Sequence, residues 1–132
     1  QVQNGGNLVL ESGTVIATKG NGINVLAQQT PNGEVVSSSL TVKGGYVNSE
    51  EYGLGAYGNK AVLNVSGGVI VADNNAVVAG NGTVNETTNA GGTEINLTGG
   101  TLIGHITSSG YIACGVYHPQ SGKLTISGDV DI

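Results

Sequence analysis

The chain has little charge, few aromatic residues and almost no cysteine. Of its 132 residues, 10% are charged and 4% are aromatic, and Phe, Trp and Met are absent. Four lysines, no arginine and a formal net charge of −5 offer almost nothing to a phosphate backbone, so nucleic-acid binding is excluded as a function. The single cysteine, Cys114, excludes a framework of internal disulfides. No apolar run approaches the ~18 residues of a membrane span, so we expect no membrane insertion.

Glycine and aliphatic residues are what the chain has in abundance. There are 24 glycines without a Gly-X-Y period, and 38% of the residues are hydrophobic. This composition argues against collagen and against disorder, and for a buried core in which glycine has a backbone role. The length predicts one domain over residues 1–132. Because the sequence opens on Gln1 and contains no Met, we expect this domain to be excised from a longer, multi-domain protein.

An internal repeat is the strongest signal in the sequence. An alternating aliphatic pattern, followed in its three middle copies by Gly-Gly, recurs five times at spacings of 23 to 32 residues. Its copies begin at Leu8, Leu40, Leu63, Ile95 and Leu124. The unequal spacings indicate stacked repeats that are joined by loops of unequal length.

Within each copy, alternation with a period of two predicts a strand with two different faces. The first and third residues are aliphatic throughout, as in Leu63 and Val65, and we expect them to stack inside. The second and fourth residues are mostly small and polar, as in Asn64 and Ser66, and are expected to form Asn and Thr ladders outside.

The Gly-Gly pairs predict a sharp corner after each of these strands, because glycine adopts positive φ without strain. A second short apolar stretch follows the corner, and a third follows that. The third stretches are expected near residues 22–25, 54–57, 76–79 and 111–114. An all-β parallel β-helix, a solenoid of about five coils with three short strands per coil, accounts for this order. A hairpin-based barrel or sandwich leaves the fivefold repeat of one strand type unexplained.

Two segments carry a family resemblance, Gly92–Leu102 and Gly115–Gly128. They resemble the pectate-lyase-like, right-handed β-helix repeats of very large surface proteins in gut Firmicutes, and the likeness covers essentially the whole chain. Among such proteins are commensal immunoglobulin-binding, superantigen-like proteins, and the chain looks like one of their domains. Because these motifs are structural, they identify the fold better than the ligand.

The resemblance implies a non-catalytic binding module, an adhesin-like domain on the bacterial cell surface and therefore extracellular. The partner it implies is a host protein, with an immunoglobulin variable region as the leading case. We predict no catalytic residue, no cofactor and no metal site. The lyases of the family pair Arg or Lys with clustered acidic residues, whereas this chain has no Arg and no clustered Asp. The glycosidases of the family use paired Asp or Glu, and here Asp73 and Asp129 lie two repeats apart. His105 and His118 have no second ligand at metal-binding spacing.

Tyrosine marks the expected contact surface, because amphipathic Tyr anchors protein interfaces. We predict an insertion over residues 46–60 and expect it to carry most of this surface. Residues 28–38 and 80–92 are interpreted as two further insertions. The contact candidates are Tyr46, Glu50, Glu51, Tyr52, Tyr57, Tyr111 and Tyr117.

Three alternatives to protein binding remain open. A carbohydrate-binding module is favoured by the polar ladders and Tyr but disfavoured by the absence of Trp. A passive stalk, with the sites in neighbouring modules, is the second alternative. A polysaccharide-lyase-like enzyme is the weakest of the three, because the acidic residues are scattered.

Overall fold

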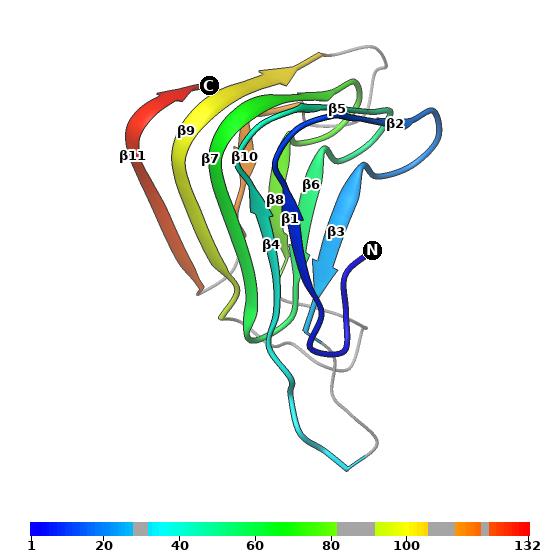
Figure 1. Ribbon diagram of the computed structural model, residues 1–132, viewed down its shortest axis with the longest axis vertical. Coiled ribbons are helices and arrows are strands. Elements are labelled where there is room, and N and C mark those ends of the chain that lie inside the picture. Colours follow the sequence, from blue (N-terminus) through cyan, green and yellow to red (C-terminus); the bar gives the residue numbers. More distant parts are fainter. Residues whose placement is uncertain (28–31, 82–91, 106–112, 120–121) are drawn as a thin grey trace.

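The structure, a computed structural model, describes residues 1–27, 32–81, 92–105, 113–119 and 122–132. Within these ranges the chain is all-β, with eleven strands and no helix. Every pairing between these strands is parallel, and the strands form one seven-stranded and one four-stranded sheet (Figure 1). The prediction of an all-β fold with parallel sheets is confirmed. In the described ranges, no helix has the length and apolarity to cross a membrane.

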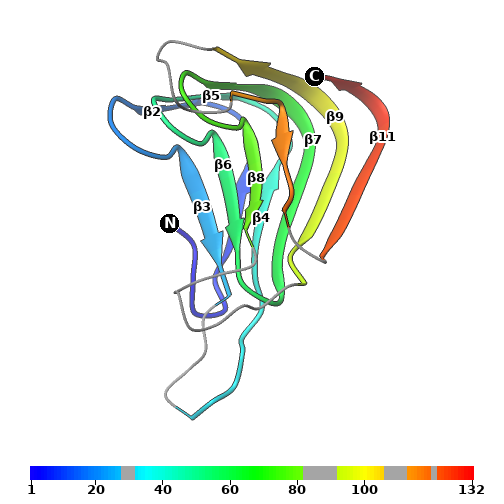
Figure 2. The same ribbon diagram turned by 180° about the vertical axis from the view of Figure 1, so that it is seen from behind.

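The strands follow the repeats of the sequence. The first repeat holds β1 (Asn7–Leu10), β2 (Thr14–Ala17) and β3 (Ile23–Leu26), and the second holds β4 (Ser38–Val42), β5 (Tyr46–Ser49) and β6 (Leu54–Tyr57). The third holds β7 (Ala61–Ala72) and β8 (Val78–Asn81), the fourth β9 (Glu94–Gly104) and β10 (Val116–Tyr117), and the fifth β11 (Lys123–Asp131). The four-stranded sheet runs β10-β8-β6-β3, and β3, β6 and β8 lie side by side in Figure 2.

The expected division into three short strands is clear only in the first two repeats. In the later repeats the first two predicted strands form one long strand, β7, β9 or β11, which curves without a break (Figure 1). Gly68 and Gly100 keep the expected positive φ, at 90° and 99°. The pairing of β7 with β9 shifts register between Val65 and Val69. The Gly-Gly segment therefore acts as a bulge that bends a continuous strand, rather than as a corner that ends it.

The register between repeats agrees with the alignment read from the sequence. Leu8 pairs with Leu40, Leu40 with Leu63, Leu63 with Ile95, and Ile95 with Leu124. One column of aliphatic residues therefore runs through all five repeats. Parallel pairing in this register places each polar ladder residue beside its equivalent in the next repeat.

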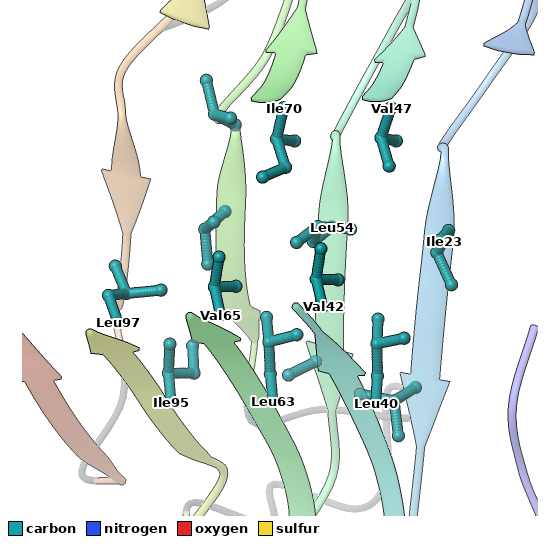
Figure 3. Close-up of a cluster of buried hydrophobic side chains, with 14 of the residues drawn as sticks. Ile23, Leu40, Val42, Val47, Leu54, Leu63, Val65, Ile70, Ile95 and Leu97 are labelled. Carbon is teal, nitrogen blue, oxygen red and sulfur yellow. The ribbon is translucent and has the colours of Figure 1, made fainter. Parts of the chain in front are cut away.

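The core lies between the two sheets. Leu40, Leu63 and Ile95 from the seven-stranded sheet are fully buried, as are Leu54 and Val78 from the four-stranded sheet. Figure 3 shows Ile23, Leu40, Leu54, Leu63 and Ile95 among the side chains that fill this space. Like aliphatic side chains stack from repeat to repeat, which explains why the core needs no Phe, Trp or Met.

Two segments differ from their prediction. Residues 46–60 are not an insertion, because β5 and β6 occupy most of this range and pair in register with their neighbours. The third strand of the fourth repeat is Val116–Tyr117, since these two residues pair with Val78 and Ala79. Of the predicted stretch 111–114, residues 113 and 114 precede this strand, and residues 111 and 112 lie outside the described residues. Of the other predicted insertions, residues 28–31 and 82–91 lie outside the described residues.

Candidate functional site

Tyr46 lies apart from the other tyrosines of the predicted contact surface. It begins β5 and is 37% exposed on the outer face of the seven-stranded sheet. The Nδ2 of Asn48 donates a hydrogen bond to its hydroxyl oxygen at 3.2 Å. On the same sheet, Ile16 of the neighbouring β2 is 66% exposed, and Ile103 of β9, beyond β7, is 36% exposed. Tyr46 thus belongs to a partly apolar surface that the sequence pattern did not single out.

Glu50 and Glu51 form the turn that leads from this sheet to the other. Their backbone N–H groups donate to the carbonyl oxygens of Ala17 and Gly20, each at 3.1 Å. The buried hydroxyl of Ser49 donates to the carbonyl oxygens of Glu51 and Val71, at 3.3 and 3.4 Å. The turn is therefore held by the repeats on both sides, and both carboxylates are exposed at the edge between the two sheets.

Tyr52 and Tyr57 lie beyond this turn, Tyr52 two residues before β6 and Tyr57 at the end of β6 in the four-stranded sheet. The backbone N–H of Tyr52 donates to Asn21 Oδ1 at 3.3 Å. The ring of Tyr57 folds back over Gly55, where an added Cβ would lie only 2.6 Å from Tyr57 Cε2 and 3.0 Å from its hydroxyl oxygen. Glycine is therefore required at position 55 for the ring to lie against the strand. Asn24 Oδ1 is also buried here, beside Gly55, without a hydrogen-bond partner in the described part of the chain.

Tyr117 reaches the same face from β10. It pairs with Ala79, Ala79 pairs with Gly55, and Gly55 pairs with Asn24. Residues that are paired across a sheet point to one side, so Tyr117 stands on the face that carries the Tyr57 ring, and it is 40% exposed. We call the surface formed by Tyr52, Tyr57 and Tyr117 the tyrosine face.

The phenols of Tyr52 and Tyr57 have raised pKa values. Burial raises the pKa of Tyr57 to about 12, and Tyr52 and Glu51 add to the rise, while a hydrogen bond with Asn21 opposes it. Burial also raises the pKa of Tyr52, followed by the electrostatic effects of Tyr117, Glu51 and Cys114. Because the unfolded pKa of Tyr is about 10, the stability that Tyr57 contributes is complete below pH 10 and is lost between pH 10 and about 12.

The polar ladder covers the outer face of β4, β7 and β9 and is largely satisfied within itself. Asn96 Nδ2 donates to Asn64 Oδ1 at 2.9 Å and to Glu94 Oε1 at 3.1 Å. Asn64 Nδ2 donates in turn to Thr41 Oγ1 at 3.5 Å. Two residues beyond Thr41 in the chain, Lys43 Nζ pairs with Glu11 Oε1 at 3.0 Å. These side chains bond mostly to one another across repeats, which leaves them fewer hydrogen-bond donors and acceptors for a ligand.

A side-chain contact that the sequence spacing did not reveal joins Asp73 and His105. His105 Nδ1 lies 3.2 Å from Asp73 Oδ1, and the backbone N–H of His105 donates to the carbonyl oxygen of Ala72. The two residues occupy equivalent places at the ends of β7 and β9, a relation that appears only once the register is known. Both side chains are substantially exposed, so the pair contributes little to stability.

The remaining candidates for chemistry are separated from one another. Cys114 is a free thiol whose pKa is raised by burial, and its Sγ lies 3.5 Å from the carbonyl oxygen of Val116. His118 Nε2 lies 3.0 Å from the carbonyl oxygen of Gly122. Within the described ranges, no three His, Cys, Asp or Glu residues group as metal ligands would.

The structure thus brings together Tyr52, Tyr57, Tyr117 and Glu51, and it separates Tyr46 from them. Glu50 lies on the same turn as Glu51. Tyr111 lies outside the described residues. The repeat alignment was the signal that could have found the tyrosine face, had the third strand of the fourth repeat been placed at Val116–Tyr117.

Comparison with known proteins adds no relative to these observations. No family model matches the chain, and no curated protein or solved structure matches it.

Proposed function

We propose that the chain is a stretch of right-handed parallel β-helix of about five coils, which serves as a non-catalytic binding module of a bacterial surface protein. Parallel pairing of each repeat with the next supports this architecture, as does the single aliphatic column from Leu8 to Leu124. The two sheets provide a rigid support for side chains that project outward.

The observation that carries this function is the tyrosine face. Tyr52, Tyr57 and Tyr117 come from two repeats that lie far apart in sequence, and they gather on one face of the four-stranded sheet. Tyrosine provides a large contact area at a low cost in side-chain entropy, and a hydroxyl group that tolerates water. With the pKa of Tyr57 at about 12, its phenol keeps its proton at neutral pH, which suits contact better than proton transfer.

The partner that we propose is a host protein, and an immunoglobulin variable region is the leading case. This choice follows from the resemblance of the repeats to those of commensal immunoglobulin-binding surface proteins, and it implies an extracellular location. The tyrosine face is compatible with it, because Tyr-rich surfaces are typical of protein interfaces.

Two tyrosines of similar exposure provide the test. Tyr117, 40% exposed, belongs to the tyrosine face, whereas Tyr46, 37% exposed, lies on the other sheet. Binding of immobilised domain to purified immunoglobulin should fall at least about tenfold in Y117A, the loss typical of an interface anchor, and stay unchanged in Y46A. Absence of immunoglobulin binding by the unmodified domain would refute the proposed partner. Equal effects of the two substitutions would refute the proposed surface.

Glycan binding is the second candidate, and one observation favours it. The Tyr57 ring lies over Gly55 with the side chain of Asn21 in hydrogen-bond contact, so an aromatic ring and an amide adjoin. Small-molecule sites combine such apolar surfaces with a few polar groups. Retention of a defined glycan on an array by the unmodified domain, and its loss in Y57A, would establish this function in place of protein binding.

A further inference from the structure

One carboxylate lies beside the tyrosine face. Glu51 directly precedes Tyr52 in the chain and is exposed. It raises the pKa of both Tyr52 and Tyr57, as a nearby negative charge does. The tyrosine face is therefore an aromatic surface with a carboxylate at its border.

Three of the four lysines contact groups away from the tyrosine face. Lys43 pairs with Glu11 at 3.0 Å, Lys60 Nζ donates to the carbonyl oxygen of Val35 at 3.2 Å, and Lys123 lies 4.0 Å from Glu94. Lys19 directly precedes Gly20, whose carbonyl oxygen accepts a hydrogen bond from the backbone N–H of Glu51. Lys19 and Glu51 nevertheless form no ion pair within 4.0 Å in the described part of the chain.

The geometry of the rings is suited to a cation. The Tyr57 ring is backed by Gly55, so one ring face lies against the strand and the opposite face is turned away from it. Tyr117 stands on the same sheet in β10, and Tyr52 precedes the start of β6 by two residues. A cation over an aromatic face is attracted by the ring quadrupole, and a carboxylate nearby adds to the attraction.

We propose that the tyrosine face takes an arginine side chain of its protein partner, with the guanidinium stacked on Tyr57 and its N–H groups turned to Glu51. Arginine fits better than lysine, because the guanidinium is planar, stacks on aromatic rings and is more weakly hydrated. This inference rests on the proposed function and names the chemistry that the partner must present.

Small probes test the site directly. N-acetyl-arginine methylamide is titrated into the domain while the tyrosine ring resonances are followed by NMR, with the lysine and citrulline analogues as matched controls. The arginine probe should shift Tyr57 and Tyr52 and leave Tyr46 unchanged. The lysine probe should bind more weakly, and the citrulline probe, which is neutral, should cause no shift. Equal shifts from arginine and citrulline would overturn the inference.

Adjacent carboxylates provide a second, independent test. E51Q should weaken binding of the arginine probe about threefold and reduce its dependence on salt, whereas E50Q should leave both unchanged. Immunoglobulin binding that needs Tyr117, yet ignores E51Q and is not inhibited by the arginine probe, would overturn this inference and leave the proposed function standing. Binding of the arginine probe by a domain that retains no immunoglobulin would support the cation site and refute the proposed partner.

Discussion

The third repeat and the two outer repeats place the same kind of residue in very different surroundings. Leu63 in β7 is fully buried. Leu8, at the equivalent position in β1, is 39% exposed, and Ile126, at the next inner position in β11, is 51% exposed. The difference lies in the pairing, because β7 has a repeat on each side while β1 pairs with β4 alone and β11 with β9 alone. In a stack of this kind, the burial of each repeat is supplied by its neighbours rather than by its own sequence.

A buried charge should show this contrast most strongly. Leu63→Asp places a carboxylate in the fully buried column and should unfold the domain, because an unpaired buried charge costs several kcal/mol. Leu8→Asp can keep its carboxylate in water and should leave the domain folded. Far-UV circular dichroism and size-exclusion chromatography of both variants check this prediction. A folded Leu63→Asp domain would contradict the assigned inner face.

Truncation should give a graded version of the same contrast. Leu63→Ala removes buried methyl groups and leaves a cavity, so we expect a loss of about 3 kcal/mol in the free energy of unfolding. Leu8→Ala removes a side chain that is already partly hydrated and should cost less than about 1.5 kcal/mol. Urea denaturation measures both values. Equal losses would show that the first repeat is as enclosed as the third.

Two glycines at equivalent bends, Gly13 in the first repeat and Gly100 in the fourth, extend the comparison to the backbone. Gly13 and Gly100 have nearly the same φ, 101° and 99°. At Gly13 an added Cβ would meet nothing within 4 Å. At Gly100 an added Cβ would lie 3.0 Å from the backbone of the third repeat. Gly13→Ala should cost about 1–2 kcal/mol from the positive φ alone, and Gly100→Ala at least about 1 kcal/mol more. Thermal unfolding of the two variants tests this order, and a larger shift for Gly13→Ala would reverse it.

The outer ladder should give the smallest effect. Asn64→Ala removes side-chain hydrogen bonds to Asn96 and Thr41 on a partly exposed surface, so we expect a loss of about 0.5–1 kcal/mol. Asn7→Ala, at the exposed end of the same face, loses the bond from Ser39 Oγ and should cost about 0.5 kcal/mol or less. Urea denaturation again provides the measurement. A loss in Asn64→Ala equal to that in Leu63→Ala would contradict the distinction between the two faces.

Much of the fold could be predicted from the alternation of the sequence, because a period of two assigns residues to faces without any tertiary information. Leu40, Leu63 and Ile95 were aligned correctly for this reason. The continuity of β7 and β9 could not be predicted, since two adjacent glycines permit both a sharp corner and a bulge, and the neighbouring repeat decides between them.

The candidate site was harder to predict than the fold. Tyr46 and Tyr52 lie six positions apart, yet the turn at Glu50 and Glu51 sends them to different sheets. Tyr117 joined the tyrosine face through its pairing with Ala79, a contact that depends on the number of residues between β9 and β10. The role of Gly55 is visible only from the ring that covers it.

Amide hydrogen exchange, measured with and without immunoglobulin, tests the central claim most directly. In the free domain, β4, β7 and β9 should exchange most slowly and β1 and β11 fastest. Immunoglobulin should add protection at residues 51–57 and 116–118 and leave the ladder strand β4 unchanged. Protection of the ladder instead of these segments, or uniform exchange across the five repeats, would contradict the account.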